Sequence, residues 1–354
     1  MHLAVLIRVF VRLPVDRPGG DHEHLRQRCG GYRRAPLSAD CRLMAADGKM
    51  NHFTSLTPSP GSRRGALHLE AGPVTLSVMR LQFEKMQGIG NDFVVLEASD
   101  ASLSLTPEQI RWIADRRFGV GCDQLLIADA PVNDGAHVAM RIFNADGSPA
   151  KQCGNGVRCF AQFVRDHGIV DADPVRIATE DRVMEASILA DGEVRADMGA
   201  PVFEPAAIPM LAAERASSYV LRVAGKEFTI GAVSMGNPHA VLVADDIEAA
   251  PVSAVGQLIQ GHEWFPKGVN VGFMQVISRD HVRLRVYERG VGETLACGSG
   301  ACAAAAVGID RGLIDKRVRV DLRGGSLAIE WHGESAPMWM TGPAARVFGG
   351  EIEL

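Results

Sequence analysis

The 354-residue chain lacks several features that define common classes of protein. No apolar run approaches the ~20 residues that a membrane-spanning helix needs, so a helical membrane protein is not expected. There is no C-x-x-C pair, and the seven cysteines are odd in number and scattered. A thioredoxin-like redox motif and a disulfide-stabilised secreted domain are therefore not expected either. These absences favour a protein of the reducing cytoplasm.

An excess of basic charge is also missing from most of the chain. The first 80 residues hold 12 lysines and arginines against 6 acidic residues, whereas the remainder holds 25 against 36. An acidic body argues against nucleic acid as a partner. With 47% hydrophobic residues, the chain has enough apolar material for two domains with cores of their own.

The first 80 residues lack the sustained periodicity of packed elements and are rich in Arg, Gly and Pro. Their apolar opening is interrupted by Arg8, which does not suit a secretory signal. Arginines would suit a transit peptide, but acidic residues such as Asp16 and Glu23 do not. We therefore interpret residues 1–80 as an extension that does not fold, with Met79 as a natural start, in preference to a functional tail.

What the chain does contain is a 21-residue repeat centred on cysteine. Arg141–Ala161 aligns without a gap on Arg285–Ala305, so that Cys153 falls on Cys297. Each copy opens with strand-like alternation, passes through a loop and enters a helix just after Cys-Gly-x-Gly. Two related halves, each with one thiol at a helix start, suggest two thiols that face one substrate.

A helix start gives such a thiol two useful properties. It favours the reactive thiolate, and its unpaired backbone N–H groups bind a carboxylate. Two such starts facing each other would hold an amino acid with one sulfur on either face of its α-carbon. One sulfur must then be thiolate and the other thiol, so the pair titrates as a unit. This arrangement suits a racemase or epimerase.

Other interpretations of these polar residues remain open at this level. Cys122, Cys159 and Cys302 fit small buried hydrophobes, and the C-x5-C and C-x4-C spacings do not suit zinc. Three short motifs could each be a simple turn; they are Gly88–Asp92, Asn144–Gly147 and Gly236–His239. His239 alone fits a structural histidine, and Glu288 with Arg289 could be a solvated pair.

From residue 81 the chain alternates short strand-like runs with a few helices. The pattern predicts strands at Phe93–Leu96, Val138–Phe143 and Val282–Tyr287, a helix capped by Thr106 and a hairpin turn at 323–326. Many strands with one main helix per half predict an α+β protein of two similar domains. We place these domains at residues 81–197 and 198–342.

Together, five motifs resemble the diaminopimelate epimerase family over residues 79–354. They are K-M-Q-G-I-G-N-D-F, N-A-D-G, Q-C-G-N-G-V-R-C, G-N-P-H and E-R-G-V-G-E-T-x-A-C-G-S-G. The resemblance implies that Cys153 and Cys297 are the catalytic pair and that His239 and Glu288 tune their thiols. The positions that it implies for substrate binding are Asn91, Gln124, Asn144, Gly154, Asn155, Asn237, Asn270, Glu288, Arg289, Gly298 and Ser299.

The resemblance also implies a fold and an activity. The fold would be two pseudo-symmetric domains, each a barrel-like sheet around a central helix, with the site in the cleft between them and the C-terminal strand, residues 343–354, returning to the first domain. The activity would be the interconversion of LL- and meso-diaminopimelate for lysine and peptidoglycan precursors, without cofactor or metal. A homodimer is implied, although Phe348 stands where some members have a tyrosine at the dimer contact.

Three alternatives accompany this hypothesis. Proline racemases and hydroxyproline epimerases share the two-thiol logic, but their cyclic substrate would not need the ring of amides and Arg289. A relative of the fold without catalysis would lack one cysteine of the pair. A zinc- or disulfide-based binding module would instead bind stoichiometric metal or respond to reductant.

Overall fold

The computed structural model of the protein describes residues 79–98, 103–131, 135–151 and 153–354. The interpretation of residues 1–80 as an extension therefore lies outside the described residues, except at its last two positions. The described residues belong to one compact unit of the chain. None of the helices among them is long and apolar enough to cross a membrane.

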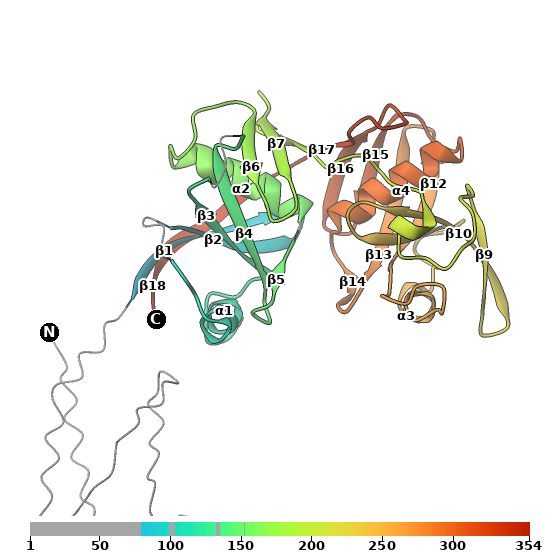
Figure 1. Cartoon of the computed structure of the whole chain (residues 1–354), viewed down its shortest axis with the longest axis horizontal. Helices are drawn as coiled ribbons and strands as arrows, with labels where there is room; N and C mark the ends of the chain where they lie inside the picture. The colour runs from blue at the N-terminus through green and yellow to red at the C-terminus, as the bar shows by residue number, and fades with distance from the viewer. Residues whose placement is uncertain (1–78, 99–102, 132–134, 152) are drawn as a thin grey trace, which may run out of the picture. The chain divides into compact units, whose positions relative to one another are not determined.

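One half of this unit, here called the N-lobe, is built from nine strands and two helices (Figure 1). Its strands are β1 (Arg80–Gly88), β2 (Asn91–Glu97), β3 (Gln124–Asp129), β4 (Val138–Asn144), β5 (Pro149–Ala150), β6 (Val175–Ala178), β7 (Val183–Ile188), β8 (Val194–Asp197) and β18 (Ala345–Glu353). Its helices are α1 (Pro107–Ala114) and α2 (Gly154–Asp166).

The other half, here called the C-lobe, has the same number of strands and helices. Its strands are β9 (Tyr219–Val223), β10 (Lys226–Ser234), β11 (Pro238–Val243), β12 (Asn270–Ser278), β13 (His281–Glu288), β14 (Gly292–Thr294), β15 (Arg317–Leu322), β16 (Gly325–Glu330) and β17 (Trp339–Gly342). Its helices are α3 (Val252–Gln260) and α4 (Gly298–Asp310), and the short 3₁₀ helix η2 (Pro205–Ala207) lies between the lobes in sequence.

The strand pairings of the two lobes follow one scheme. In the N-lobe, β2 runs parallel to β3, β3 antiparallel to β4, and β4 parallel to β6. In the C-lobe, β11, β12, β13 and β15 repeat these three pairings in the same order. The lobes are joined by an antiparallel pairing of β8 with β17. Strand β18 closes the chain by pairing with β1.

A helix lies inside the curved sheet of each lobe. Helix α2 contacts β1, β2, β3, β7 and β8, and α4 contacts strands from β10 to β16. In Figure 1 both helices are flanked by strands of their own lobe. Their apolar side chains belong to one core that continues through both lobes. The predicted α+β class with a barrel-like sheet around a central helix is confirmed.

Most of the predicted elements agree with the observed ones to within two residues. Thr106 and Gln109 form the predicted capping box of α1, and the turn at 323–326 joins β15 to β16. Strands β10 and β17 were not predicted, because neither shows a strict alternation of apolar and polar residues. The predicted domain boundary near residue 198 follows the end of β8, and the domain limits themselves stay a prediction.

Candidate active site

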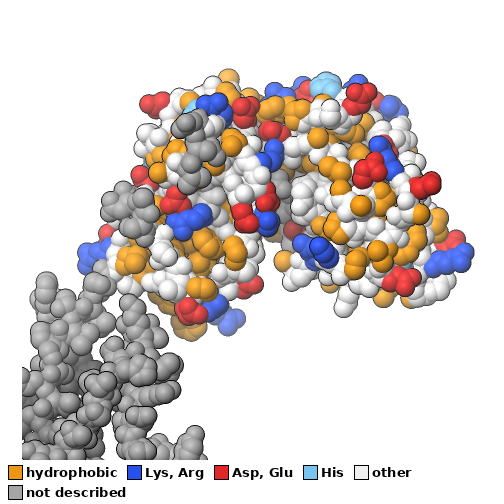
Figure 2. Space-filling view, viewed as in Figure 1, with side chains coloured by type: hydrophobic (Ala, Val, Ile, Leu, Met, Phe, Trp, Pro, Cys, Tyr) orange, Lys and Arg blue, Asp and Glu red, His pale blue; other side chains and the backbone are white. Residues whose placement is uncertain are grey.

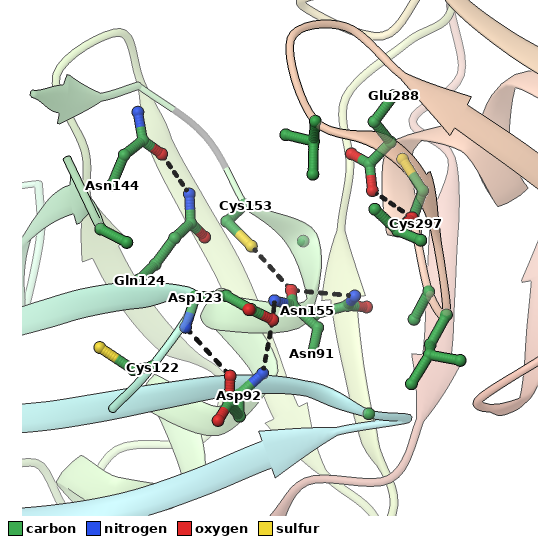
Figure 3. Close-up of a pocket in the computed structure, with 18 of the residues that line it drawn as sticks. Asn91, Asp92, Cys122, Asp123, Gln124, Asn144, Cys153, Asn155, Glu288 and Cys297 are labelled. Atoms are coloured by element: carbon green, nitrogen blue, oxygen red, sulfur yellow. Dashed lines mark hydrogen bonds between the residues drawn. The ribbon is translucent and has the colours of Figure 1, made fainter. Parts of the chain in front are cut away.

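The two repeated cysteines occupy equivalent places in the two lobes. Cys153 is the N-cap of α2 and Cys297 is the N-cap of α4, each with extended backbone, as the repeat predicts. Both line one pocket of about 1300 Å³, which the surface in Figure 2 shows as a hollow between the lobes. In Figure 3 the two side chains come from opposite sides of this pocket. The structure thus brings together two thiols that are 144 positions apart in the sequence.

The first residues of both helices form the floor of the pocket. Gly154 and Asn155 begin α2, Gly298 and Ser299 begin α4, and all four line the pocket. The N–H groups of a first helical turn have no acceptor within the helix, so they are available to an anion. A Cβ on Gly154 would stand 2.6 Å from the end of the Met198 side chain, so a larger residue there would require this methionine to move.

The acidity of the two thiols differs from the sequence-based expectation. Burial raises the pKa of Cys153 to about 11, although the Gly156 N–H, 3.3 Å from its sulfur, acts in the opposite direction. Burial and the negative charge of Glu288 raise the pKa of Cys297 well above its usual value. The N–H groups of the helix starts act in favour of the thiolates, as expected, but the loss of hydration on burial outweighs them.

A chain of amides lines the N-lobe side of the pocket. Gln124 Nε2 donates to Asn144 Oδ1 over 3.0 Å, and Asn144 Nδ2 donates to Ser148 Oγ over 3.1 Å. Asn91 Oδ1 accepts from Cys153 Sγ at 3.6 Å and from Asn155 Nδ2 at 3.3 Å. Gly90, with a φ of 88°, forms the turn that places Asn91 at the start of β2. The turn interpretation of the motif Gly88–Asp92 is thus correct, and a substrate-binding role of Asn91, which lines the pocket, stays a prediction.

The C-lobe side presents an equivalent group of polar residues. Asn237 Nδ2 donates to Ser299 Oγ over 3.3 Å, and His239 Nε2 lies 2.9 Å from Asn237 Oδ1 and 3.1 Å from Ser299 Oγ. Asn270 Oδ1 accepts from the backbone N–H of Arg289 at 2.9 Å. Burial and the nearby Arg289 charge lower the pKa of His239 to about 3, so its imidazole is neutral at ordinary pH.

Glu288 and Arg289 follow one another at the end of β13 and both line the pocket. Glu288 is partly buried and accepts a 2.5 Å hydrogen bond from Thr294 Oγ1. Burial raises the pKa of the Glu288 carboxyl. Arg289 Nη1 donates to the carbonyl of Lys267 over 2.9 Å. Of the predicted pocket residues, only His239 is absent from the lining, because it lies directly behind Asn237 and Ser299.

The sequence did not reveal a charged group beside Asn91. Asp123, Asp92, Lys85 and Arg116 all line the pocket. Arg116 Nη2 bonds both Asp92 and Asp123 at 2.7 Å, and Lys85 Nζ bonds Asp92. Burial alone would raise the pKa of Asp92, but the hydrogen bonds from Arg116 and Lys85 lower it below its usual range. The available signal was the parallel register of β2 and β3, which puts Asp123 next to Asp92.

The remaining described cysteines agree with their interpretation as buried residues. Burial raises the pKa of Cys122 to about 11 and those of Cys159 and Cys302 to about 12. Cys122 nevertheless reaches the wall of the pocket. Within the described ranges, no three or more His, Cys, Asp or Glu side chains are placed to hold a metal ion.

Comparison with known proteins agrees with this geometry. The diaminopimelate epimerase family model matches residues 83–204 and 231–347. A diaminopimelate epimerase of Nitrosomonas europaea is 53% identical over 276 residues, covering 78% of this chain and 100% of the relative. That of Laribacter hongkongensis is 55% identical over 278 residues, with the same two coverages.

More distant structures share the fold. A probable proline racemase from Agrobacterium radiobacter superposes with a TM-score of 0.57 at 16% identity, covering 77% of this chain and 92% of that one. A phenazine biosynthesis protein of the PhzF family from Bacillus anthracis superposes with a TM-score of 0.53 at 15% identity, covering 77% and 99%. These neighbours show a common architecture.

Proposed function

Because the chain belongs to the diaminopimelate epimerase family, we propose that it interconverts LL-2,6-diaminopimelate and meso-diaminopimelate by moving protons at two cysteines. The chain is an isomerase, and the family places it in lysine biosynthesis. The observation that carries the mechanism is the pair of thiols, Cys153 and Cys297, which cap two helices and face one pocket from opposite lobes.

The helix starts would hold the reacting end of the substrate. The N–H groups at Gly154, Asn155, Gly298 and Ser299 would bind the carboxylate next to the α-carbon. As the α-proton leaves, negative charge moves onto that carboxylate, and the same N–H groups stabilise it. The α-carbon would then lie between the two sulfurs. No cofactor is required, since the carboxylate and its donors accept the charge.

One sulfur must remove a proton while the other delivers one to the opposite face. Both thiols have raised pKa values in this structure, so one proton must leave the pair before turnover. The substrate ammonium group beside a sulfur would favour that loss by its positive charge. We propose that two residues set the pKa of the Cys297 thiol. Glu288 would act through its negative charge, and the neutral His239 would act through its contact with Ser299.

The distal amino-acid group would bind to the amides and charges farther along the pocket. An ammonium group needs acceptors and a carboxylate needs donors, and Gln124, Asn144, Asn237 and Asn270 supply both from their amides. Asn91, which lies beside Cys153, would contact the reacting end instead. Arg289 would pair with the distal carboxylate and Glu288 with the distal ammonium. This double recognition separates diaminopimelate from a small cyclic imino acid.

Purified protein tests the proposal directly. It should incorporate tritium from solvent into LL-diaminopimelate with no addition, and should be unaffected by hydroxylamine or a metal chelator. Cys153→Ser and Cys297→Ser should each lose incorporation, and L-proline should not be racemised. Activity that requires pyridoxal phosphate or metal, or proline racemisation in place of diaminopimelate turnover, would contradict the proposal.

We also propose that the enzyme is a homodimer with contacts at the β1–β18 edge. Phe348 is 47% exposed there and stacks edge-on against Phe83. Phe348→Lys should reduce the dimer fraction measured by light scattering after size-exclusion chromatography. Val220→Lys is the matched control, because Val220 is 51% exposed on β9, the C-lobe counterpart of β18. A wild-type monomer, or equal effects of both variants, would refute the contact.

A cytoplasmic location would suit this chemistry. The proposed mechanism needs unpaired thiols, and all five cysteines that the structure describes are free. A reducing compartment keeps thiols in that state. Cell fractionation, with a cytoplasmic marker protein as reference, tests the location.

A further inference from the structure

Asp123 lies just before β3 and bonds the side chain of Asn91 across the parallel β2–β3 pair (Figure 3). Asn91 Nδ2 donates to Asp123 Oδ2 over 2.9 Å. The other oxygen of Asp123 accepts from Arg116 Nη2 at 2.7 Å. The Asp92 N–H also donates to Asp123 Oδ2, over 3.2 Å. Asp123 is thus held from both sides while it faces Asn91.

The opposite end of the Asn91 amide faces the first sulfur. Asn91 Oδ1 lies 3.6 Å from Cys153 Sγ and 3.3 Å from Asn155 Nδ2. A carboxylate accepts hydrogen bonds but cannot donate one, so the amide nitrogen must point toward Asp123. The amide oxygen must then point toward Cys153, where it accepts the S–H proton. Asp123 thereby decides which end of the amide the sulfur meets.

Without Asp123 a second arrangement would be available. Asn155 Oδ1 is buried and has no hydrogen-bond partner among the residues that the structure describes. If the Asn91 and Asn155 amides both turned over, the Asn91 nitrogen could donate to Asn155 Oδ1 and to Cys153 Sγ as well. The turned arrangement would give that buried oxygen the hydrogen-bond partner that it lacks. A neighbour of Asn91 that can accept a hydrogen bond but cannot donate one is therefore needed to exclude the turned arrangement.

We propose that Asp123 is a positioning residue of the thiol pair, which holds the Asn91 oxygen against Cys153 so that Cys153 keeps its proton until substrate binds. The inference rests on the two-thiol function proposed above. An amide oxygen beside the sulfur stabilises the thiol, whereas an amide N–H would stabilise the thiolate.

This role has a chemical purpose in a reversible epimerase. Each sulfur acts as base in one direction and as acid in the other, so the two need comparable proton affinities. The negative charge of Glu288 raises the pKa of Cys297 directly. In the N-lobe, Asp123 would raise the pKa of Cys153 indirectly, by orienting the Asn91 amide. The two lobes would thus reach similar thiol acidity by different means.

Alkylation of the free enzyme measures the effect without turnover. Each cysteine's reaction with iodoacetamide would be followed from about pH 6 to pH 11 by peptide mass spectrometry. In Asp123→Asn the rate at Cys153 should rise about three- to tenfold near pH 8, as for a pKa lowered by about half a unit to one unit. The rate at Cys297 should stay as in the wild type.

Two further variants serve as a control and as a substitute for Asp123→Asn. Asp129→Asn removes an acid that is ion-paired with Arg141 at the far end of β3, away from Asn91, and should leave both cysteines unchanged. Asp123→Ser also removes the carboxylate and should act in the same direction if Asp123→Asn does not fold.

A double-mutant cycle then separates positioning from the loss of a negative charge. In an Asn91→Ala background, Asp123→Asn should have no further effect on Cys153. An unchanged Cys153 rate in the single variant, a shift that persists without the Asn91 amide, or an equal shift at Cys297 would each overturn the inference. A protein that shows the predicted alkylation pattern but does not epimerise diaminopimelate would instead refute the proposed function.

Discussion

The two lobes present equivalent residues to the pocket but hold them with different chemistry. Asn91 in the N-lobe and Asn237 in the C-lobe both follow a glycine with left-handed φ, Gly90 and Gly236. The first contacts a residue at the start of α2 and the second contacts a residue at the start of α4. Yet Asn91 is anchored by a carboxylate and Asn237 by the neutral imidazole of His239.

The shared part of the lobes is the part that a carboxylate would contact. Both lobes provide a cysteine cap, two further helix-start residues and the same parallel and antiparallel strand order. The divergent part surrounds the sulfurs and the distal end of the pocket, where Asn144 in one repeat stands at the position of Glu288 in the other. The reacting centre would thus be treated alike from both faces, whereas the distal end of the substrate would extend from it in one direction and meet different partners.

The largest expected effect comes from removing one of the two thiols. Cys153→Ala and Cys297→Ala should each reduce epimerisation by at least about a thousandfold, because either direction needs both groups. Halide elimination from β-halogenated diaminopimelate needs only proton removal, so each variant should retain it for the isomer whose proton faces the surviving sulfur. Halide release from the separate isomers measures this preference. If both variants process the same isomer, one base serves both faces.

Replacing Glu288 by an uncharged residue should lower the pKa of the Cys297 thiol. In Glu288→Gln the alkylation profile of Cys297 should move to lower pH, because the charge that raises its pKa is lost. Epimerisation should fall about ten- to a hundredfold through weaker distal binding and mismatched thiols. Glu248→Gln, which removes an exposed partner of Arg283, is the control. A Cys297 profile equal to the wild type would contradict this electrostatic role.

The equivalent arginines of the repeat should differ in their contribution to stability. Each arginine forms two hydrogen bonds to one carboxylate, Arg285 to Glu293 and Arg141 to Asp129. Arg285 is only 14% exposed, whereas Arg141 is 38% exposed. Arg285→Ala should lower the free energy of unfolding by about 2–3 kcal/mol and Arg141→Ala by about 1 kcal/mol. Urea denaturation of the two variants measures this, and equal losses would contradict the expected effect of burial.

The smallest effect concerns the neutral anchor of the C-lobe. The pKa of His239 is lowered from 6.5 to about 3, so between these values the unfolded chain binds a proton that the native state does not. Stability should therefore fall as pH decreases below 6.5, by on the order of 1–2 kcal/mol at pH 5 relative to pH 7. His239→Gln should show a smaller loss over the same interval in urea denaturation. Identical pH dependence in the two proteins would exclude His239 as the source.

Sequence reasoning located the backbone of the site but not the environment of its sulfurs. The helix starts at Cys153 and Cys297 could be predicted because a local motif, Cys-Gly-x-Gly, occurs twice. The raised thiol pKa could not, because it arises from burial by side chains such as Met198 that are distant in sequence. Asp123 was missed for a similar reason, since its contact with Asn91 depends on the register of two parallel strands.

For the fold too, elements with a local sequence signal could be predicted, whereas strands that depend on distant pairing could not. Helix α1 was predicted from its capping box, since Thr106 and Gln109 are neighbours in the sequence. Strand β17 has four residues and pairs with β16 on one side and, on the other, with β8, about 140 positions earlier. Strand β10 ends in an apolar run buried against α4, where no alternation remains to identify a strand.

Strand β17 also carries Met340, whose side chain lies against the first residue of both central helices. A Cβ on Gly154 would stand 2.7 Å from its terminal carbon, and one on Gly298 would stand 3.2 Å from its sulfur. Arg158 Nη1 approaches the same sulfur at 3.4 Å. The first residues of both central helices thus pack against one side chain at this point. A change in the size of residue 340 would therefore affect both helix starts at once.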